Sequence, residues 1–180
     1  MLKPEECVLL IVDVQGRLAQ IMHKAEQLEQ TLCTLVNAVD LLEIPILYLE
    51  QLPDKLGPTS PRLQECLQPR HKPITKAHFS AWHSGEFRDA ITGMGRRQVL
   101  LAGIETHICV YQTCRDLQDN DFDVHILVDG VSSRTLENKQ LGITMMTQYG
   151  AKVTNTESLL FELQQEARGD RFKALLKMIK

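Results

Sequence analysis

The sequence predicts an α/β protein built around a parallel sheet whose crossovers are right-handed. Short apolar runs alternate along the 180 residues with segments in which apolar side chains recur at helical spacing. The first run, residues 7–14, is apolar almost throughout, which is typical of a strand buried on both faces of a parallel sheet. The sequence contains no internal repeat, low-complexity tract or linker, so residues 1–180 are expected to form one domain.

Proline and glycine residues mark the ends of the predicted elements. Residues 24–43 have apolar positions near helical period, and Pro45 ends that helix before a strand at 46–49. Residues 51–72 contain four prolines and are predicted to be a long loop with a short helix at most, a kind of loop that is usually functional or mobile. After a short strand at 73–76 the alternation continues to the end of the chain. It predicts helices at 86–94, about 108–119, 135–148, about 156–166 and about 170–179, with strands at 99–102, 123–128 and 152–154 between them.

Composition and charge exclude several classes of function. The formal net charge is −3, so the chain has no general attraction for nucleic acid or for an anionic membrane. No apolar run approaches the ~20 residues that span a bilayer, and the first residues lack a signal-peptide layout, so a cytoplasmic location is expected. The five cysteines lack metal-type spacing and are expected to be free thiols. Neither a glycine-rich dinucleotide motif nor a metal-type histidine spacing occurs, so no cofactor and no metal is expected.

Three chemically active side chains lie at the carboxyl ends of predicted strands. Asp13 comes at the end of the first strand, Lys76 ends the third, and Cys109 follows the fourth at the expected start of a helix. In a parallel sheet these ends share one edge, which is where sites are found. A carboxylate beside a thiol can take its proton, and an ammonium near both holds them in their charged forms. The unpaired N–H groups and the dipole of the helix start are expected to favour the Cys109 thiolate.

Each of these residues also has a simpler interpretation. Asp13 is equally consistent with a helix cap or turn, Lys76 taken singly with a solvated surface lysine, and Cys109 with a small buried side chain. A rival Cys–His hydrolase would use His107, which lies two residues before the cysteine and is expected to point elsewhere on the turn.

Two aromatic side chains, Phe79 and Trp82, follow the third predicted strand in a chain with only 5% aromatic residues. They are interpreted as a pocket wall, with ordinary core packing as the strong alternative. A pocket wall of this kind suggests a flat or partly apolar substrate.

Four ordered motifs resemble those of the isochorismatase-like hydrolase superfamily, also called cysteine hydrolases, over nearly the whole chain. The motifs are Leu10 to Gln15, Lys76 with Phe79 to Trp82, Gly103 to Val110, and Asp129 to Arg134. The resemblance implies a Rossmann-like three-layer α/β/α fold with a six-stranded parallel sheet. It also implies a small-molecule substrate and a homo-oligomer, which is a dimer, a tetramer or larger.

The resemblance also assigns roles to individual residues. It maps a catalytic triad onto Asp13, Lys76 and Cys109. It implies a cis peptide bond between Ile104 and Glu105, which aims the backbone N–H groups of Glu105 and Cys109 at a developing oxyanion. Metal-dependent nicotinamidases of the family carry an Asp-x-His motif and a further histidine after the second strand, and the corresponding loop here has no histidine. The expected substrate pocket contains Gln15, Phe79, Trp82 and Thr106.

These residues predict hydrolysis of a C–N bond of a small molecule. In the expected mechanism Asp13 takes the Cys109 proton while Lys76 stabilises the charge, and the thiolate attacks an amide carbonyl to give a thioester that water hydrolyses. The alternatives are vinyl-ether hydrolysis of the isochorismatase type, peroxide-driven redox chemistry at Cys109, and a binding protein that retains the fold without the chemistry. The sequence does not assign the physiological substrate.

Overall fold

Six parallel strands form the centre of the protein. The strands are β1 (Cys7–Val12), β2 (Ile46–Gln51), β3 (Ile74–Lys76), β4 (Gln98–Ile104), β5 (Asp123–Ser132) and β6 (Lys152–Thr154). They pair in the order β3-β2-β1-β4-β5-β6 in a computed structural model that describes residues 1–67 and 69–179. Every pairing is parallel, which confirms the predicted architecture.

The central strand is β1, and its sequence explains this position. All six of its residues are buried, because both faces of the strand are covered. It pairs with β2 on one side and with β4 on the other. The chain therefore runs outward from β1 to β3 and then continues from β4 to β6 on the opposite side. The switch point lies between β1 and β4, and ligands of such sheets bind beyond the carboxyl ends of the strands there.

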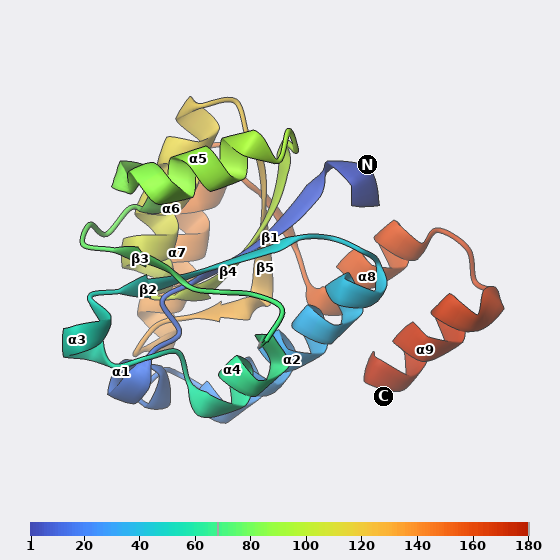
Figure 1. The fold of residues 1–180 in the computed structure, drawn as a ribbon, viewed down its shortest axis with the longest axis horizontal. Coiled ribbons are helices and arrows are strands. Elements are labelled where there is room, and N and C mark those ends of the chain that lie inside the picture. Colours follow the sequence, from blue (N-terminus) through green and yellow to red (C-terminus); the bar gives the residue numbers. More distant parts are fainter. Residues whose placement is uncertain (68, 180) are drawn as a thin grey trace.

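Helices cover both faces of the sheet and complete three layers (Figure 1). The helices on one face are α2 (Ala25–Leu41), α4 (Pro61–Leu67), α8 (Thr156–Gln164) and α9 (Gly169–Ile179). Those on the other face are α5 (Gly85–Gly93), α6 (Tyr111–Asp119) and α7 (Leu136–Gln148). Each face buries its own apolar core against the sheet, so the Rossmann-like three-layer fold is confirmed.

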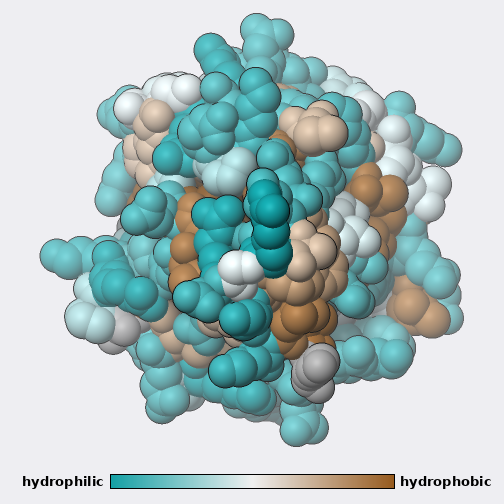
Figure 2. Space-filling view, turned by 90° about the vertical axis from the view of Figure 1, so that its right-hand side faces the viewer, coloured by the Kyte–Doolittle hydropathy of each residue, from teal (hydrophilic) through white to brown (hydrophobic). Residues whose placement is uncertain are grey.

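The last helix, α9, turns its apolar side inward. Leu175 is fully buried, and Met178 and Ile179 pack against the core that α2 covers. The face of the molecule that carries α9 and the N-terminus is mostly hydrophilic, with its apolar side chains in separate patches (Figure 2). Among the described residues, no helix is long and apolar enough to cross a membrane.

The segment at 51–72 contains two helices, which corrects the predicted loop. They are α3 (Pro53–Leu56) and α4, while residue 68 lies outside the described part of the chain. Both helices begin at a proline, whose fixed φ suits the first helical position and whose missing N–H would have no partner there. Two of the four prolines of the segment, Pro53 and Pro61, therefore mark helix starts. A further short helix, α1 (Gly16–Gln20), lies where none is predicted.

Several strand ends also differ from the prediction. The fourth strand does not stop before Gly103, because β4 and β5 pair again after a register shift at this point. Both strands are therefore longer than predicted. The first strand ends at Val12 rather than at residue 14, since Asp13 has φ +53° and leaves the extended conformation.

Gly103 allows β1 and β4 to approach closely beside the switch point. Its φ is +113°, which L side chains rarely adopt, and a Cβ there would lie 2.2 Å from Val12 O and 2.4 Å from Val12 N. Because these are backbone atoms of the central strand, they cannot move aside without disturbing the sheet. Gly103 thus sets the separation of the strand ends that lead to Asp13 and Ile104.

Gly103→Ala is therefore expected to lower the free energy of unfolding by about 2–5 kcal/mol, through backbone strain and overlap with β1. Urea unfolding followed by circular dichroism measures the change. Gly93→Ala in α5 is the matched control, because a Cβ there has no neighbour within 4 Å. This control is expected to raise the free energy of unfolding by about 0.5–1 kcal/mol, and equal effects of the two substitutions would contradict the explanation.

Candidate active site

One edge of the sheet gathers the side chains that the sequence analysis selects. Asp13 follows β1, Lys76 ends β3, and Cys109 lies between β4 and α6 in a π-helical turn at Thr106–Val110. A cavity of about 90 Å³ opens at this edge. Its lining residues are Asp13, Leu18, Gln51, Leu56, Phe79, Ile104, Glu105, Ile108 and Cys109. Within the described chain, no group of three or more His, Cys, Asp or Glu side chains is placed to hold a metal ion.

Lys76 and Asp13 form an ion pair that is almost completely buried. Lys76 Nζ donates to Asp13 Oδ2 at 2.6 Å, and the two side chains are 0% and 3% exposed. The ammonium also donates to Gln51 Oε1 at 3.0 Å and contacts the carbonyl oxygens of His78 and Phe79 at 3.0 and 3.1 Å. A buried charge persists where its hydrogen-bonding capacity is satisfied in this way. The interpretation of Lys76 as a solvated surface lysine is therefore wrong.

Asp13 keeps one carboxylate oxygen without a conventional hydrogen bond. Oδ2 accepts from Lys76, whereas Oδ1 is buried and has no hydrogen-bond partner among the described residues. Burial raises the pKa of this carboxyl, and the Lys76 ammonium and the Cys109 thiol act in the opposite direction. Asp13 is thus a base with a free acceptor atom, and the Cys109 thiol interacts with its charge.

Cys109 is a buried thiol rather than a thiolate. Its residue is 7% exposed, and Sγ donates to Gln51 Oε1 at 3.6 Å. The pKa of Cys109 is raised to about 12, chiefly by burial and then by the Asp13 carboxylate, although the Lys76 ammonium lowers it. The prediction of a thiolate favoured by a helix start is therefore wrong, because desolvation outweighs the favourable charges around the sulfur. The thiol needs a base at the moment of reaction.

Gln51 connects these residues and is missing from the sequence prediction. Its Oε1 accepts from two donors, Lys76 Nζ and Cys109 Sγ. Its backbone is held by the Gln15 side chain, which accepts from Gln51 N at 2.6 Å and donates to Gln51 O at 3.2 Å. Because Gln51 is the last residue of β2, the strand-end argument that selects Asp13 would also have selected Gln51.

Glu105 borders the cavity, and its carboxylate is bound by Arg134 in the segment between β5 and α7. The peptide bond between Ile104 and Glu105 is cis, as the family resemblance implies. The Glu105 carboxylate accepts from Arg134 N and Arg134 Nε, both at 3.2 Å. Arg134 ends the last of the four sequence motifs, so this motif contributes an anchor beside the turn that carries Cys109.

His107 contacts the β5–α7 connection, which disfavours a Cys–His pair. Its Nδ1 lies 3.0 Å from Ser133 Oγ. The same turn is packed tightly against α7, because a Cβ on Gly142 would lie 2.6 Å from Thr106 C and 2.7 Å from His107 N. The turn is therefore fixed by contacts with α7 and with the residues after β5.

Comparison with known proteins identifies the family of this chain. A sequence model of the Isochorismatase domain matches residues 7–158. The chain belongs to the isochorismatase family of hydrolases. The secreted isochorismatase effector Isc1 of Phytophthora sojae is 36% identical over 180 residues, covering 98% of this chain and 86% of that protein. Because this relative is named as secreted, a cytoplasmic location of the present chain stays a prediction.

Solved structures of related proteins share the fold. The MAR1 ribonuclease from Caenorhabditis elegans superposes with a TM-score of 0.92 at 31% identity, covering 99% of this chain and 91% of its own. The YcaC gene product of Escherichia coli, described as an octameric hydrolase of unknown specificity, superposes with a TM-score of 0.91 at 21% identity. That superposition covers 98% of this chain and 89% of the bacterial one, and it shows the fold alone. The resemblance inferred from the four motifs is confirmed.

Of the four residues expected in the substrate pocket of this family member, only Phe79 lines the cavity in the described chain. Gln15 is fully buried and ties β2 to the loop that follows it, and Thr106 is fully buried at the start of the π-helical turn. Trp82 packs edge-on against Phe122 with ring centroids 6.0 Å apart, so its alternative interpretation as a core residue holds. These three residues therefore do not line the cavity at Cys109, and their contacts are with the core and the neighbouring loops.

The raised pKa of Cys109 predicts a slow alkylation that accelerates steeply with pH. With a pKa of about 12, its rate with iodoacetamide rises about tenfold per pH unit from about pH 7 to 11, whereas a free cysteine levels off above about pH 9. Asp13→Asn removes a charge that raises this pKa, so the rate at about pH 8 is expected to increase roughly tenfold. Peptide mass spectrometry after a limiting dose of reagent measures both effects.

Cys114 is the internal control for this experiment, because burial alone raises its pKa to about 12. Its labelling is expected to be the same in the wild-type protein and in Asp13→Asn. A Cys109 profile that levels off like that of a free thiol, or slower labelling of Cys109 in Asp13→Asn, would contradict the assigned interactions.

Proposed function

We propose that this chain hydrolyses a C–N bond of a small amide through a thioester on Cys109. The observation that carries the proposal is the buried Asp13–Lys76 ion pair, which leaves Asp13 Oδ1 without a hydrogen bond in the described chain while the nearby thiol is protonated. A base and a nucleophile in one small cavity, with a cation paired to the base, are the groups that acyl transfer requires.

In the first half of the proposed reaction, Asp13 Oδ1 takes the proton of Cys109 as Sγ attacks the amide carbonyl carbon. Lys76 remains an ammonium and stabilises the negative charge in the cavity. The carbonyl oxygen becomes an oxyanion, for which the backbone N–H groups of Glu105 and Cys109 are the proposed donors. Asp13 then gives its proton to the nitrogen, the C–N bond breaks, and the amine leaves a thioester on Cys109.

In the second half, water attacks the thioester carbonyl while Asp13 takes a proton from the water. The C–S bond breaks and that proton returns to Sγ, so the products are a carboxylic acid and an amine. The high pKa of Cys109 suits these steps, since a thiolate of high pKa is intrinsically more nucleophilic than one of low pKa. Burial also raises the pKa of Asp13, which brings the base closer to the thiol whose proton it must accept.

The cavity favours a substrate with a small acyl group. Its volume of about 90 Å³ is well below the ~300–1,000 Å³ of sites for drug-sized ligands. The walls from Leu18, Leu56 and Ile108 are apolar, and Phe79 adds an aromatic side chain. A short aliphatic amide fits these walls better than a large aromatic substrate does.

Vinyl-ether hydrolysis is the second candidate, because the matching domain carries the name of isochorismatase. In that reaction Cys109 need not act as the nucleophile. A binding protein without chemistry is the third. The nematode relative is named a ribonuclease, but the net charge of −3 gives this chain no general attraction for RNA.

Cys109→Ala is expected to lower ammonia release from short aliphatic amides such as butyramide by about a thousandfold or more, because the nucleophile is lost. A coupled ammonia assay measures turnover, and intact mass spectrometry of the wild-type protein detects the acyl adduct. Cys114→Ala is the matched control, since it removes a fully buried thiol outside the cavity and is expected to retain activity.

The three candidate functions give different results in this experiment. An amide-cleaving Cys109→Ala variant would rule out the thioester. If both proteins instead cleave isochorismate and neither cleaves amides, the vinyl-ether reaction is favoured. If the wild-type protein turns over neither class of substrate, the binding protein is favoured.

We also propose that the chain forms a homo-oligomer through β6 and α7. The strand β6 is at the edge of the sheet, and Val153 on it is 54% exposed. Leu141 of α7 is 52% exposed, and Tyr149 at the end of this helix is 43% exposed. Exposed apolar side chains and an open strand edge are both typical of an interface, and the E. coli protein of this fold is described as octameric.

Sedimentation velocity is therefore expected to give a mass at least twice that of one chain. Leu141→Glu, which places a charge in the proposed interface, is expected to shift the distribution toward the monomer. A wild-type protein that sediments as a monomer would contradict this proposal.

A further inference from the structure

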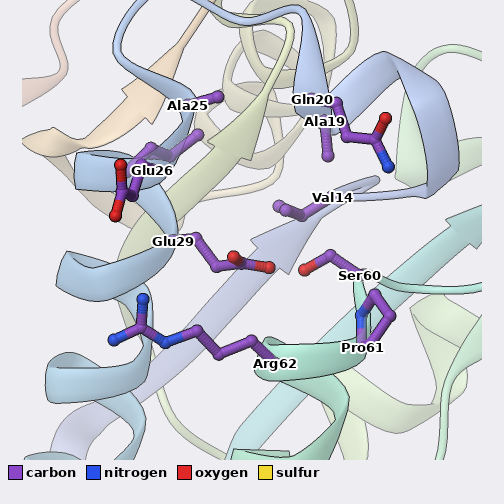
Figure 3. Close-up of a pocket in the computed structure, with 10 residues that line it drawn as sticks. Val14, Ala19, Gln20, Ala25, Glu26, Glu29, Ser60, Pro61 and Arg62 are labelled. Atoms are coloured by element: carbon purple, nitrogen blue, oxygen red, sulfur yellow. The ribbon is translucent and has the colours of Figure 1, made fainter.

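A second cavity of the described chain lies beside the active site but is separate from it. It has a volume of about 410 Å³ and opens between α1, the start of α2 and the start of α4 (Figure 3). Its lining residues are Val14, Ala19, Gln20, Ala25, Glu26, Leu28, Glu29, Ser60, Pro61 and Arg62, none of which lines the cavity at Cys109. This volume is within the ~300–1,000 Å³ range of sites that bind small molecules.

Two polar side chains, Glu29 and Ser60, meet inside this cavity without satisfying one another. Figure 3 shows the Glu29 carboxylate and Ser60 Oγ pointing toward each other from α2 and from the residue before α4. Ser60 is 7% exposed and its Oγ has no hydrogen-bond partner among the described residues. The half-buried Glu29 carboxylate likewise takes part in no hydrogen bond or ion pair within the described chain. Buried and half-buried polar groups of this kind gain free energy when a partner reaches them.

The charges around the cavity favour a cationic partner. Glu29 is the innermost charged group, and Glu26 on the exposed rim is also acidic. The Arg62 side chain extends from α4 toward α2 and away from Ser60 in Figure 3, and within the described chain it forms no ion pair with either glutamate. The carboxylate only accepts hydrogen bonds and the hydroxyl oxygen can accept as well as donate, so a group with several donors can bond both at once.

The inner part of the remaining wall is apolar, and Gln20 adds an amide. Val14, Ala19 and Leu28 are all buried in the same core and border the cavity. A ligand that matches both parts of the site has a compact apolar body and a charged donor group at one end.

We propose that this cavity binds a small primary amine with a compact apolar body. The ammonium group lies between the Glu29 carboxylate and Ser60 Oγ, and the apolar body contacts Val14, Ala19 and Leu28. An ammonium carries three N–H donors, which is enough to bond both acceptors and still face the exposed rim. This site is independent of the proposed amide hydrolysis.

The helix α1 connects the two cavities. Leu18 borders the active-site cavity, whereas the next two residues, Ala19 and Gln20, border the amine cavity. Ser60 N also donates to Val14 O at 2.9 Å, one residue after Asp13. A bound amine would therefore contact the helix that forms one wall of the active site.

Isothermal titration calorimetry with benzylamine as the probe tests the proposal. At neutral pH benzylamine is a cation, and its neutral analogue benzyl alcohol and its anionic analogue benzoate are expected to bind at least about tenfold more weakly. Glu29→Gln is expected to weaken benzylamine binding at least about tenfold, and Ser60→Ala about threefold, because each loses one acceptor. Glu26→Gln is the matched control, since it removes the same charge from the exposed rim and is expected to change the affinity less than about twofold.

Several results would overturn the proposal. Wild-type protein that gives no binding heat with benzylamine, or that binds benzyl alcohol equally well, would show that the cavity holds only water or apolar ligands. Equal losses of benzylamine affinity in Glu29→Gln and Glu26→Gln would show that the amine responds to the total negative charge of this region and not to the Glu29 carboxylate. Benzoate binding that depends on Arg62 would assign the cavity to anions.

Two further controls keep the experiment decisive. Cys109→Ala is expected to bind benzylamine as the wild-type protein does, so an affinity lost in this variant would place the amine in the active site instead. If circular dichroism shows that Glu29→Gln is unfolded, the effect of Ser60→Ala and the preference for the amine over its two analogues decide the outcome.

Discussion

The buried ion pair between Asp13 and Lys76 is the interaction on which the candidate active site depends. The strand order places β2 between the two residues, so the Lys76 side chain reaches across the end of β2 to meet Asp13 at 2.6 Å. Gln51, at that end, accepts from the same ammonium, and two carbonyl groups of the loop after β3 complete its partners. Because a buried charge is tolerated only when it is paired and hydrogen-bonded, the pair constrains three strand ends and one loop at once.

The burial that this pair requires also determines the state of the thiol. Removing water from the cavity raises the pKa of Cys109 to about 12, so the cysteine is stored as a thiol despite the ammonium nearby. The same burial raises the pKa of Asp13. Because the pKa values of both Cys109 and Asp13 are raised, the Cys109 thiol can pass its proton to the Asp13 carboxylate when a substrate binds. In the proposed mechanism the reactive thiolate therefore exists only during the reaction.

Close backbone contacts hold the other side of the site. Gly103 allows β4 to approach β1, and Gly142 allows α7 to approach the turn that carries Cys109. Arg134 is the last residue of the fourth sequence motif, and it anchors Glu105, the residue before that turn. These contacts place the nucleophile relative to the ion pair, since a packed interior leaves little room for the turn to shift.

The sequence by itself determined the alternation of strands and helices, the parallel sheet, and the placement of Asp13, Lys76 and Cys109 at one edge. Those conclusions rest on hydrophobic periodicity and on breaks in it, which are local properties of the chain. Tertiary structure decided the rest: the role of Gln51, the packing of Trp82 on Phe122, the loop contacts of Gln15 and the protonated state of Cys109. Each of these features depends on which elements pack together and on how much water remains between them. The spacing of residues along the chain determines neither the packing nor the remaining water.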